Sequence, residues 1–206
     1  MPLVRKPAAS SAPASPSPAE VFACLGSADP AERWAAARAA AELPDSASAL
    51  AAALPKETEA RVREAMLTSL VLIATRDSLL SLLPMLRADD AALRMGALDA
   101  LRSSAPIVRE VLPRLLQDPD ADVRIVSCEL ARALPSEDAS RALSALLISE
   151  SEVNVCAAAI EVLAEVGTTV ALPALAQCAQ RFAQVPFVTF AIRLATDRIT
   201  AADDRG

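Results

Sequence analysis

Four arginines recur at nearly constant spacing and are the most regular chemical feature of this chain. Arg33, Arg63, Arg94 and Arg124 are separated by 30, 31 and 30 residues, and each follows an acidic turn near the start of an alanine-rich stretch. A planar guanidinium donates several hydrogen bonds at once and can bridge neighbouring turns. We expect these arginines to form a structural ladder, with direct ligand binding as the alternative. The acidic residues expected to pair with them are Asp29, Glu57, Asp89, Asp90, Asp118, Asp120 and Asp122.

The four cysteines offer little for catalysis or metal binding. They lie far apart in the sequence without a C-x-x-C pair, and the chain contains no histidine and no tyrosine. We therefore expect no catalytic residue, no metal site and no cofactor, and we expect Cys128 to be a small buried residue. Cys156 stands where a fifth arginine would be, 32 residues after Arg124. A helix N-terminus can activate a thiol, but no cationic residue lies near Cys156 in the sequence, which argues against a nucleophile.

The composition favours a helical, acidic protein. Of the 206 residues, 53% are hydrophobic but only 2% are aromatic and four are glycine, which suits closely packed helices better than a sheet. The formal net charge of −6 argues against sequence-independent nucleic-acid binding. No apolar run is long enough to cross a bilayer, and the N-terminus lacks the apolar run of a secretory signal. We expect a cytoplasmic protein with no nucleic-acid or membrane partner, and the preference for arginine over lysine suggests a bacterial one.

The spacing of the arginines predicts one helix pair repeated side by side. The clearest copy runs from Ile107 to Leu134 as IVREVLPRLLQ, then the turn DPDAD, then VRIVSCELARAL. Asp118 with Pro119 is a start signal for the second helix of that copy. We expect a disordered Ala/Ser/Pro tail at 1–18, a repeat domain at 19–200 and a flexible end at 201–206. The last repeat departs from the pattern, and its phenylalanines, Phe182, Phe187 and Phe190, are expected to cap the array.

The segment DPDADVR, followed by an alanine-containing amphipathic helix, resembles HEAT repeats, specifically the short HEAT-like type found in phycobilisome (bilin) lyase families. The likeness covers about residues 20–200. It implies an all-α fold, a right-handed α-α superhelix of about five to six helical hairpins. It also suggests an alternative function, a bilin lyase-like or cofactor-insertion chaperone subunit that acts with a partner chain. The lack of histidine and tyrosine gives that alternative little support.

Residues at one place in every unit share one environment, so the stacked copies predict a surface map. The columns that stay apolar along the second helices predict the core. One such column consists of Val62, Leu93, Val123 and Val155. Another consists of Ala37, Leu67, Leu98, Cys128 and Ile160. These positions lie on one face of a helix.

Three further columns mix charged and apolar residues and are expected to face solvent, and the resemblance to HEAT repeats implies that they line the concave face. The groove residues expected to bind a partner are Trp34, Arg38, Glu64, Met95, Asp99, Arg102, Ile125, Glu129, Arg132 and Glu161. Exposed Trp34, Met95 and Ile125 suggest apolar anchors for another protein. Contact with the N-terminal tail, or an error of one position in register, is the alternative. The leading hypothesis is a non-enzymatic protein-binding adaptor or scaffold of unknown oligomeric state. Substituting Trp34 and Ile125 together should then abolish partner capture without unfolding.

Overall fold

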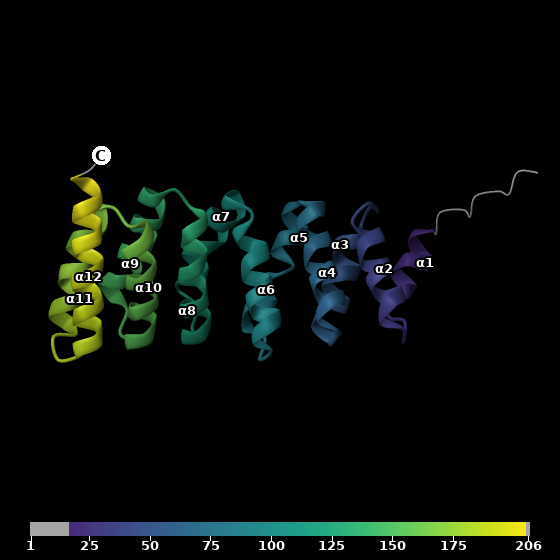
Figure 1. Cartoon of the computed structure of the whole chain (residues 1–206), viewed down its shortest axis with the longest axis horizontal. Coiled ribbons are helices and arrows are strands. Elements are labelled where there is room, and N and C mark those ends of the chain that lie inside the picture. The colour runs from purple at the N-terminus through teal and green to yellow at the C-terminus, as the bar shows by residue number, and fades with distance from the viewer. Residues whose placement is uncertain (1–16, 205–206) are drawn as a thin grey trace, which may run out of the picture.

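The helices of the chain stand side by side in one extended array, with α1 at one end and α12 at the other (Figure 1). The computed structural model describes residues 17–204. The α-helices are α1 (Pro18–Cys24), α2 (Pro30–Ala40), α3 (Ser46–Ala53), α4 (Ala60–Ile73), α5 (Arg76–Leu80), α6 (Ala91–Arg102), α7 (Ala105–Leu115), α8 (Ala121–Leu130), α9 (Ser136–Ser149), α10 (Val153–Val166), α11 (Leu172–Arg181) and α12 (Pro186–Asp203). Short 3-10 turns lie at Leu54–Lys56, Leu83–Arg87, Ala131–Ala133 and Thr169–Ala171.

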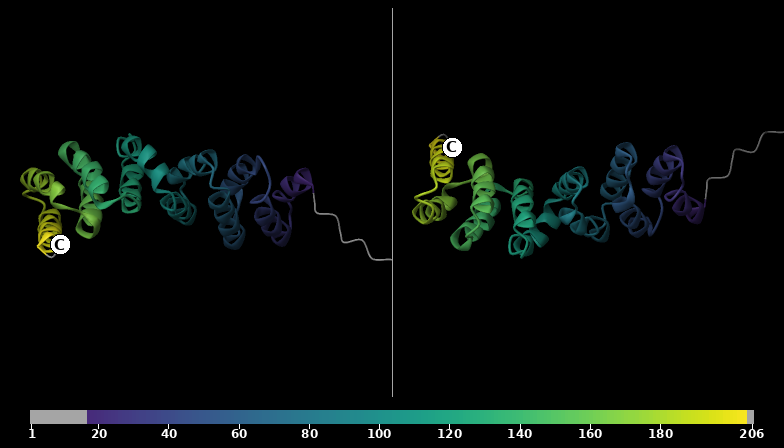
Figure 2. Two further views of the ribbon diagram at one scale, coloured as in Figure 1. Left: turned by 90° about the horizontal axis from the view of Figure 1, so that it is seen from above. Right: turned by 90° about the horizontal axis from the view of Figure 1, so that it is seen from below.

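The described helices form six hairpins, and the odd-numbered and even-numbered helices separate into two rows (Figure 2). Consecutive second helices contact one another along the whole array, α2 with α4, α4 with α6, α6 with α8, α8 with α10 and α10 with α12. First helices do the same where α3 meets α5, α5 meets α7 and α9 meets α11. The predicted all-α solenoid of five to six hairpins is confirmed. We call the exposed side of the even-numbered helices the second-helix face.

The acidic turns start the second helices because their aspartates satisfy free amide groups. The side chains of Asp29, Asp90 and Asp120 accept the N–H groups of Ala31 at 2.9 Å, Ala92 at 2.8 Å and Asp122 at 2.9 Å. The predicted start of α8 at Asp118 and Pro119 is wrong by two residues. Asp120 caps the helix, whereas the Asp118 carboxylate accepts the Asp120 N–H at 2.9 Å and shapes the turn before it.

The predicted core columns are buried, with one informative exception. Val62, Val155 and Leu98 are buried as expected, whereas Leu67 is only half-buried. Gly96 on α6 explains the difference, because a Cβ added there would lie 2.5 Å from Leu67 Cδ1. The missing side chain at Gly96 gives Leu67 its space, and Leu67 therefore borders the surface between α4 and α6 instead of the centre of the core.

The ends of the array differ from the sequence-based expectation in detail. Ser17 caps α1 and Pro18 begins it, and the remaining residues of the expected tail lie outside the described part of the chain. At the other end α12 continues to Asp203, past the expected boundary at residue 200. Of the three phenylalanines expected to cap the array, Phe182 is buried, but Phe187 and Phe190 are exposed. The terminal helix therefore presents aromatic side chains to solvent.

Candidate functional site

Each arginine of the ladder donates to the backbone carbonyl six residues before it. Arg33 reaches Ser27 at 3.0 Å, Arg63 reaches Glu57 at 2.9 Å, Arg94 reaches Ala88, and Arg124 reaches Asp118 at 2.8 Å. The four guanidinium groups thus share one contact, which fastens each turn to the second helix that follows it. These carbonyls have no partner within a helix, so a charged donor stabilises them well.

Three of these arginines also bind an acid in the turn of the next unit. Arg33 donates to both carboxylate oxygens of Glu57, at 2.7 and 3.0 Å, and Arg124 does the same with Glu150, at 2.7 and 3.2 Å. Arg63 instead donates to Asp90 at 2.9 Å. The forked pairs connect consecutive hairpins in addition to the apolar core.

One column of turn residues decides which acid each arginine reaches. We call it the turn column, and it consists of Ser27, Glu57, Ala88, Asp118 and Glu150. Ala88 has no carboxylate, so Arg63 turns to Asp90 and its Nε atom is buried without a hydrogen-bond partner among residues 17–204. Asp118 is one methylene shorter than a glutamate and pairs with Arg87, so the only hydrogen bond of the Arg94 side chain recorded among residues 17–204 goes to the Ala88 carbonyl.

Both buried glutamates of the turn column are held in their charged form. The Arg33 hydrogen bonds are the main reason that the pKa of Glu57 lies below its ordinary value of 4.5. For Glu150, burial raises the pKa, but the hydrogen bonds from Arg124 and from the turn amides outweigh burial and lower it. Those amides are the N–H groups of Ser151 and Glu152, each 2.9 Å from Glu150 Oε1. Each of the two charged pairs, Arg33 with Glu57 and Arg124 with Glu150, therefore connects one hairpin to the next.

Among the acids expected to pair with these arginines, only Glu57 and Asp90 do so. Asp118 and Asp120 lie near Arg87, and Asp29 caps α2. No ion pair of Asp89 or Asp122 is present in the described part of the chain. The sequence reasoning omitted Glu150, which binds Arg124.

Cys156 takes over the first contact of the missing fifth arginine. Its Sγ lies 3.7 Å from the Glu150 carbonyl oxygen, six residues before it. The next unit brings Arg181 beside this thiol in place of an acid, and Arg181 donates to the Leu147 and Ile148 carbonyls at the end of α9. Hydrogen bonding with Cys178 and burial raise the pKa of Cys156, so its thiol is a poor nucleophile. Arg181 is thus a cation near Cys156 that the sequence did not reveal, but the Cys156 thiol is buried.

Trp34, the single tryptophan of the chain, lies half-buried on the second-helix face between two arginines. The guanidinium carbon of Arg38 is 4.9 Å from the centre of the ring, and that of Arg61 on α4 is 4.3 Å from it. These cation–π contacts join α2 to α4. A groove of about 620 Å³ begins here and includes Glu64 and Leu72 on α4.

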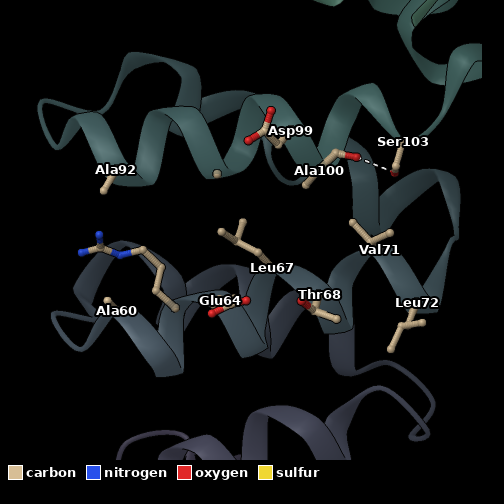
Figure 3. Close-up of a pocket in the computed structure, with 12 residues that line it drawn as sticks. Ala60, Glu64, Leu67, Thr68, Val71, Leu72, Ala92, Asp99, Ala100 and Ser103 are labelled. Carbon is tan, nitrogen blue, oxygen red and sulfur yellow. Dashed lines mark hydrogen bonds between the residues drawn. The ribbon is translucent and has the colours of Figure 1, made fainter.

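A second groove, of about 500 Å³, lies between α4 and α6. Figure 3 shows Leu67 pointing from α4 towards α6, with Val71 and Ala100 continuing the apolar floor. Glu64 lies on α4 and Asp99 on α6. Glu64, Thr68 and Leu72 line both grooves, so the two form one continuous surface across α2, α4 and α6. Leu72 is 68% exposed on it.

Some of the remaining predicted groove residues are exposed, and others pack against the core or form ion pairs. Met95 is 48% exposed, and Glu161 is exposed on α10. Ile125, like Trp34, packs partly against the core. Arg132 donates to Glu129 at 2.9 Å and to Glu165, and Arg102 lies 3.7 Å from Asp99. Glu129 near the end of α8 and Arg132 in the 3-10 turn after it therefore already neutralise each other.

The part of the chain that the structure describes contains no group of three or more residues placed to hold a metal ion. In the same part, none of the helices combines the length and the apolar character that crossing a membrane requires.

Residues 108–185 match the family model for HEAT repeats. This segment of the chain therefore contains HEAT repeats. No curated protein matches the sequence. The match to the family model confirms, for the repeat unit, the resemblance expected from the sequence, which was to HEAT-like repeats of the bilin lyase type.

Several solved structures are similar to this helical array. Two are engineered proteins from the Northeast Structural Genomics Consortium: one is 20% identical with a TM-score of 0.40 over 89% of this chain and 96% of its own, and the other is 18% identical with a TM-score of 0.43 over 91% and 100%. A third is the complex of CpcE and CpcF of phycocyanin lyase from Nostoc sp. PCC7120, 17% identical with a TM-score of 0.35 over 96% of this chain and 100% of that one. Likenesses at this identity concern the fold alone.

Extending the repeat register into the last unit locates surface residues that the sequence reasoning missed. Val188 and Ile192 of α12 are buried four residues apart, like Val155 and Ala159 of α10. By this register Phe190, 62% exposed, continues the column of Trp34 and Met95, and exposed Leu194 continues the next column. Sequence reasoning lost this register because no arginine marks the start of α12. The Trp34–Arg61 contact was missed because it depends on how α2 and α4 pack.

Proposed function

We propose that this protein is a non-enzymatic scaffold that binds another protein through the second-helix face of its HEAT array. One observation carries the proposal: an apolar groove between α4 and α6 and an adjoining groove of mixed polarity between α2 and α4 share exposed Leu72. Apolar side chains in contiguous grooves at a surface are typical of protein-binding sites. The opposite row of helices also exposes apolar residues, such as Ile148 on α9, which offers a matched control.

The chemistry of the chain supports binding over catalysis. The sequence has no histidine or tyrosine, and Cys128, Cys156 and Cys178 are buried. The arginines with the strongest contacts, Arg33 and Arg124, are occupied in holding hairpins together. Their use as scaffold elements leaves the grooves and exposed side chains of the second-helix face for recognition.

The structure points to better substitutions for testing this function than the sequence did. Trp34 and Ile125 both pack partly against the core, so the double substitution suggested by the sequence would also destabilise the protein. Leu72 and Met95 are 68% and 48% exposed and can be changed with little effect on folding. We expect Leu72→Asp with Met95→Asp to remove a defined partner in affinity capture from the native host.

The matched control is Ile148→Asp, at a residue 54% exposed on α9. It adds the same kind of charge outside the second-helix face and should retain the partner. Circular dichroism and melting of each variant should remain close to those of the unmodified protein. Equal retention by the groove variant and the control would overturn the proposal.

A further inference from the structure

We infer that the groove between α4 and α6 binds an amphipathic helix that carries lysine or arginine beside its apolar residues. The inference rests on the proposed function and adds the chemistry of the partner. It follows from the shape and apolar floor of the groove and from the charges left unbalanced at its edges.

The floor of the groove is apolar and runs along the helices. Leu67, Val71 and Ala100 face it, and Gly96 leaves room there because it has no side chain. The lining runs from Ala60 to Leu72 on α4, which at 1.5 Å per residue corresponds to about 18 Å. A helix of about three turns has that length, and helices of this kind place apolar side chains at i, i+3 or i+4, and i+7 in such grooves.

The charges beside this floor are unbalanced towards the negative. Arg63 also lines the groove, but its guanidinium donates to the Glu57 carbonyl and to the Asp90 carboxylate, both at 2.9 Å. Glu64 has no ion pair within residues 17–204, and Asp99 has only a loose one, 3.7 Å from Arg102. Two carboxylates therefore lie on opposite helices, and among residues 17–204 only Asp99 has a counter-charge, the loosely paired Arg102 on its own helix.

The cations of the adjoining groove are engaged with its tryptophan. Arg38 and Arg61 both lie over the Trp34 ring, and Glu42 is the further acid of that groove. The whole chain carries 26 acidic and 20 basic residues. A partner helix with basic residues beside its apolar stripe would pair with Glu64 and Asp99, whereas an acidic helix would be repelled.

The experiment uses two synthetic 14-residue helices with the same apolar stripe of leucines, one flanked by lysines and one by glutamates. Both lack tryptophan, so Trp34, the single tryptophan of the chain and a neighbour of this groove, reports binding by its fluorescence. At low salt we expect the lysine helix to bind at least tenfold more tightly, because two exposed ion pairs contribute about a few-fold each and the glutamate helix replaces attraction by repulsion. The difference should shrink as salt rises.

The double variant Glu64→Gln with Asp99→Asn should remove most of this preference while both helices still bind. Glu137→Gln, at an exposed acid of α9 in the opposite row of helices, is the matched control and should leave the preference unchanged. Ala92→Lys adds a cation to the exposed edge of the groove and should weaken only the lysine helix. A preference that survives the double variant, equal binding of the two helices, or saturable binding of neither would overturn the inference.

The experiments distinguish a failure of this inference from a failure of the proposed function. If the host partner is still lost on Leu72→Asp with Met95→Asp while neither synthetic helix binds, the face binds a protein of different chemistry and only this inference is wrong. If the host partner is retained by that variant, the proposed function is wrong as well.

Discussion

The turn column predicts that one substitution will strengthen the scaffold. Ala88 occupies the place of Glu57 and Glu150, and the backbones agree: φ is −64°, −78° and −70°, and ψ is 139°, 127° and 130°, for Ala88, Glu57 and Glu150 respectively. A glutamate at position 88 would therefore point its carboxylate as its two equivalents do. It would meet Arg63, whose Nε is buried without a partner among the described residues.

The expected gain follows from the contacts that Ala88→Glu would create. Leaving a buried donor without a partner costs about 1–3 kcal/mol, and a charged hydrogen bond contributes about 1.5–3 kcal/mol. Against this gain, a carboxylate must leave water, and Arg63 already has a half-exposed partner in Asp90. We expect a net increase in the free energy of unfolding of about 1 kcal/mol, which for a protein of this size raises Tm by about 2–4 °C.

Chemical denaturation and melting of three variants measure this gain. Ala88→Gln offers a neutral acceptor and should recover less than half of it, and Ala88→Leu should recover none. In an Arg63→Ala background, Ala88→Glu should give no gain, because the carboxylate then has no cation to bind. A gain that persists without Arg63, or a loss of stability in the unmodified background, would refute the equivalence of the turns.

Three further outcomes follow from the same contacts. Arg124→Ala should destabilise the protein by about 2–4 kcal/mol because it strands the buried Glu150 carboxylate, whereas Arg94→Ala should cost about 1 kcal/mol because it removes one carbonyl contact; equal losses in denaturant titrations would contradict this ranking. The pKa values of Glu57 and Glu150 are lowered from 4.5, so their contribution is complete above that pH and is lost as the pH falls towards the folded-state values. The denaturant concentration at the unfolding midpoint should therefore decrease as the pH is lowered below 4.5, and this decrease should be less steep in Arg124→Ala. If the midpoint has the same pH dependence in both proteins, Glu150 is not responsible. Finally, the residue that ends α4, Ala74, has a left-handed φ of 52°, so Ala74→Gly should raise the free energy of unfolding by about 0.5–1 kcal/mol, and a decrease in Tm would count against a strained C-cap there.

The repeat made the fold predictable, because one helix pair defines all the others. Sequence columns located the core, including Cys128, and the contact of each ladder arginine with a turn. The partner of Arg124 was missed because the acids were assigned by their position in the turn motif. The turn column, which includes Glu150 at the end of α9, gives the correct pairing.

Other features depended on geometry that periodicity does not contain. Leu67 belongs to a core column by pattern, but Gly96 on the neighbouring helix places it at a groove. Arg61 stacks on Trp34 only because of the relative rotation of α2 and α4. Arg181 reaches the thiol of Cys156 from the next hairpin, a contact between residues that no sequence motif connects.

Site-specific photo-cross-linking tests the binding role of the second-helix face most directly. A photoreactive amino acid would replace Leu72 on α4 in one protein and Ile148 on α9 in another, since both side chains are more than half exposed. After irradiation in the native host, position 72 should yield a discrete cross-linked protein that position 148 does not. The same product from both positions, or a product from position 148 alone, would contradict a binding surface on the even-numbered helices.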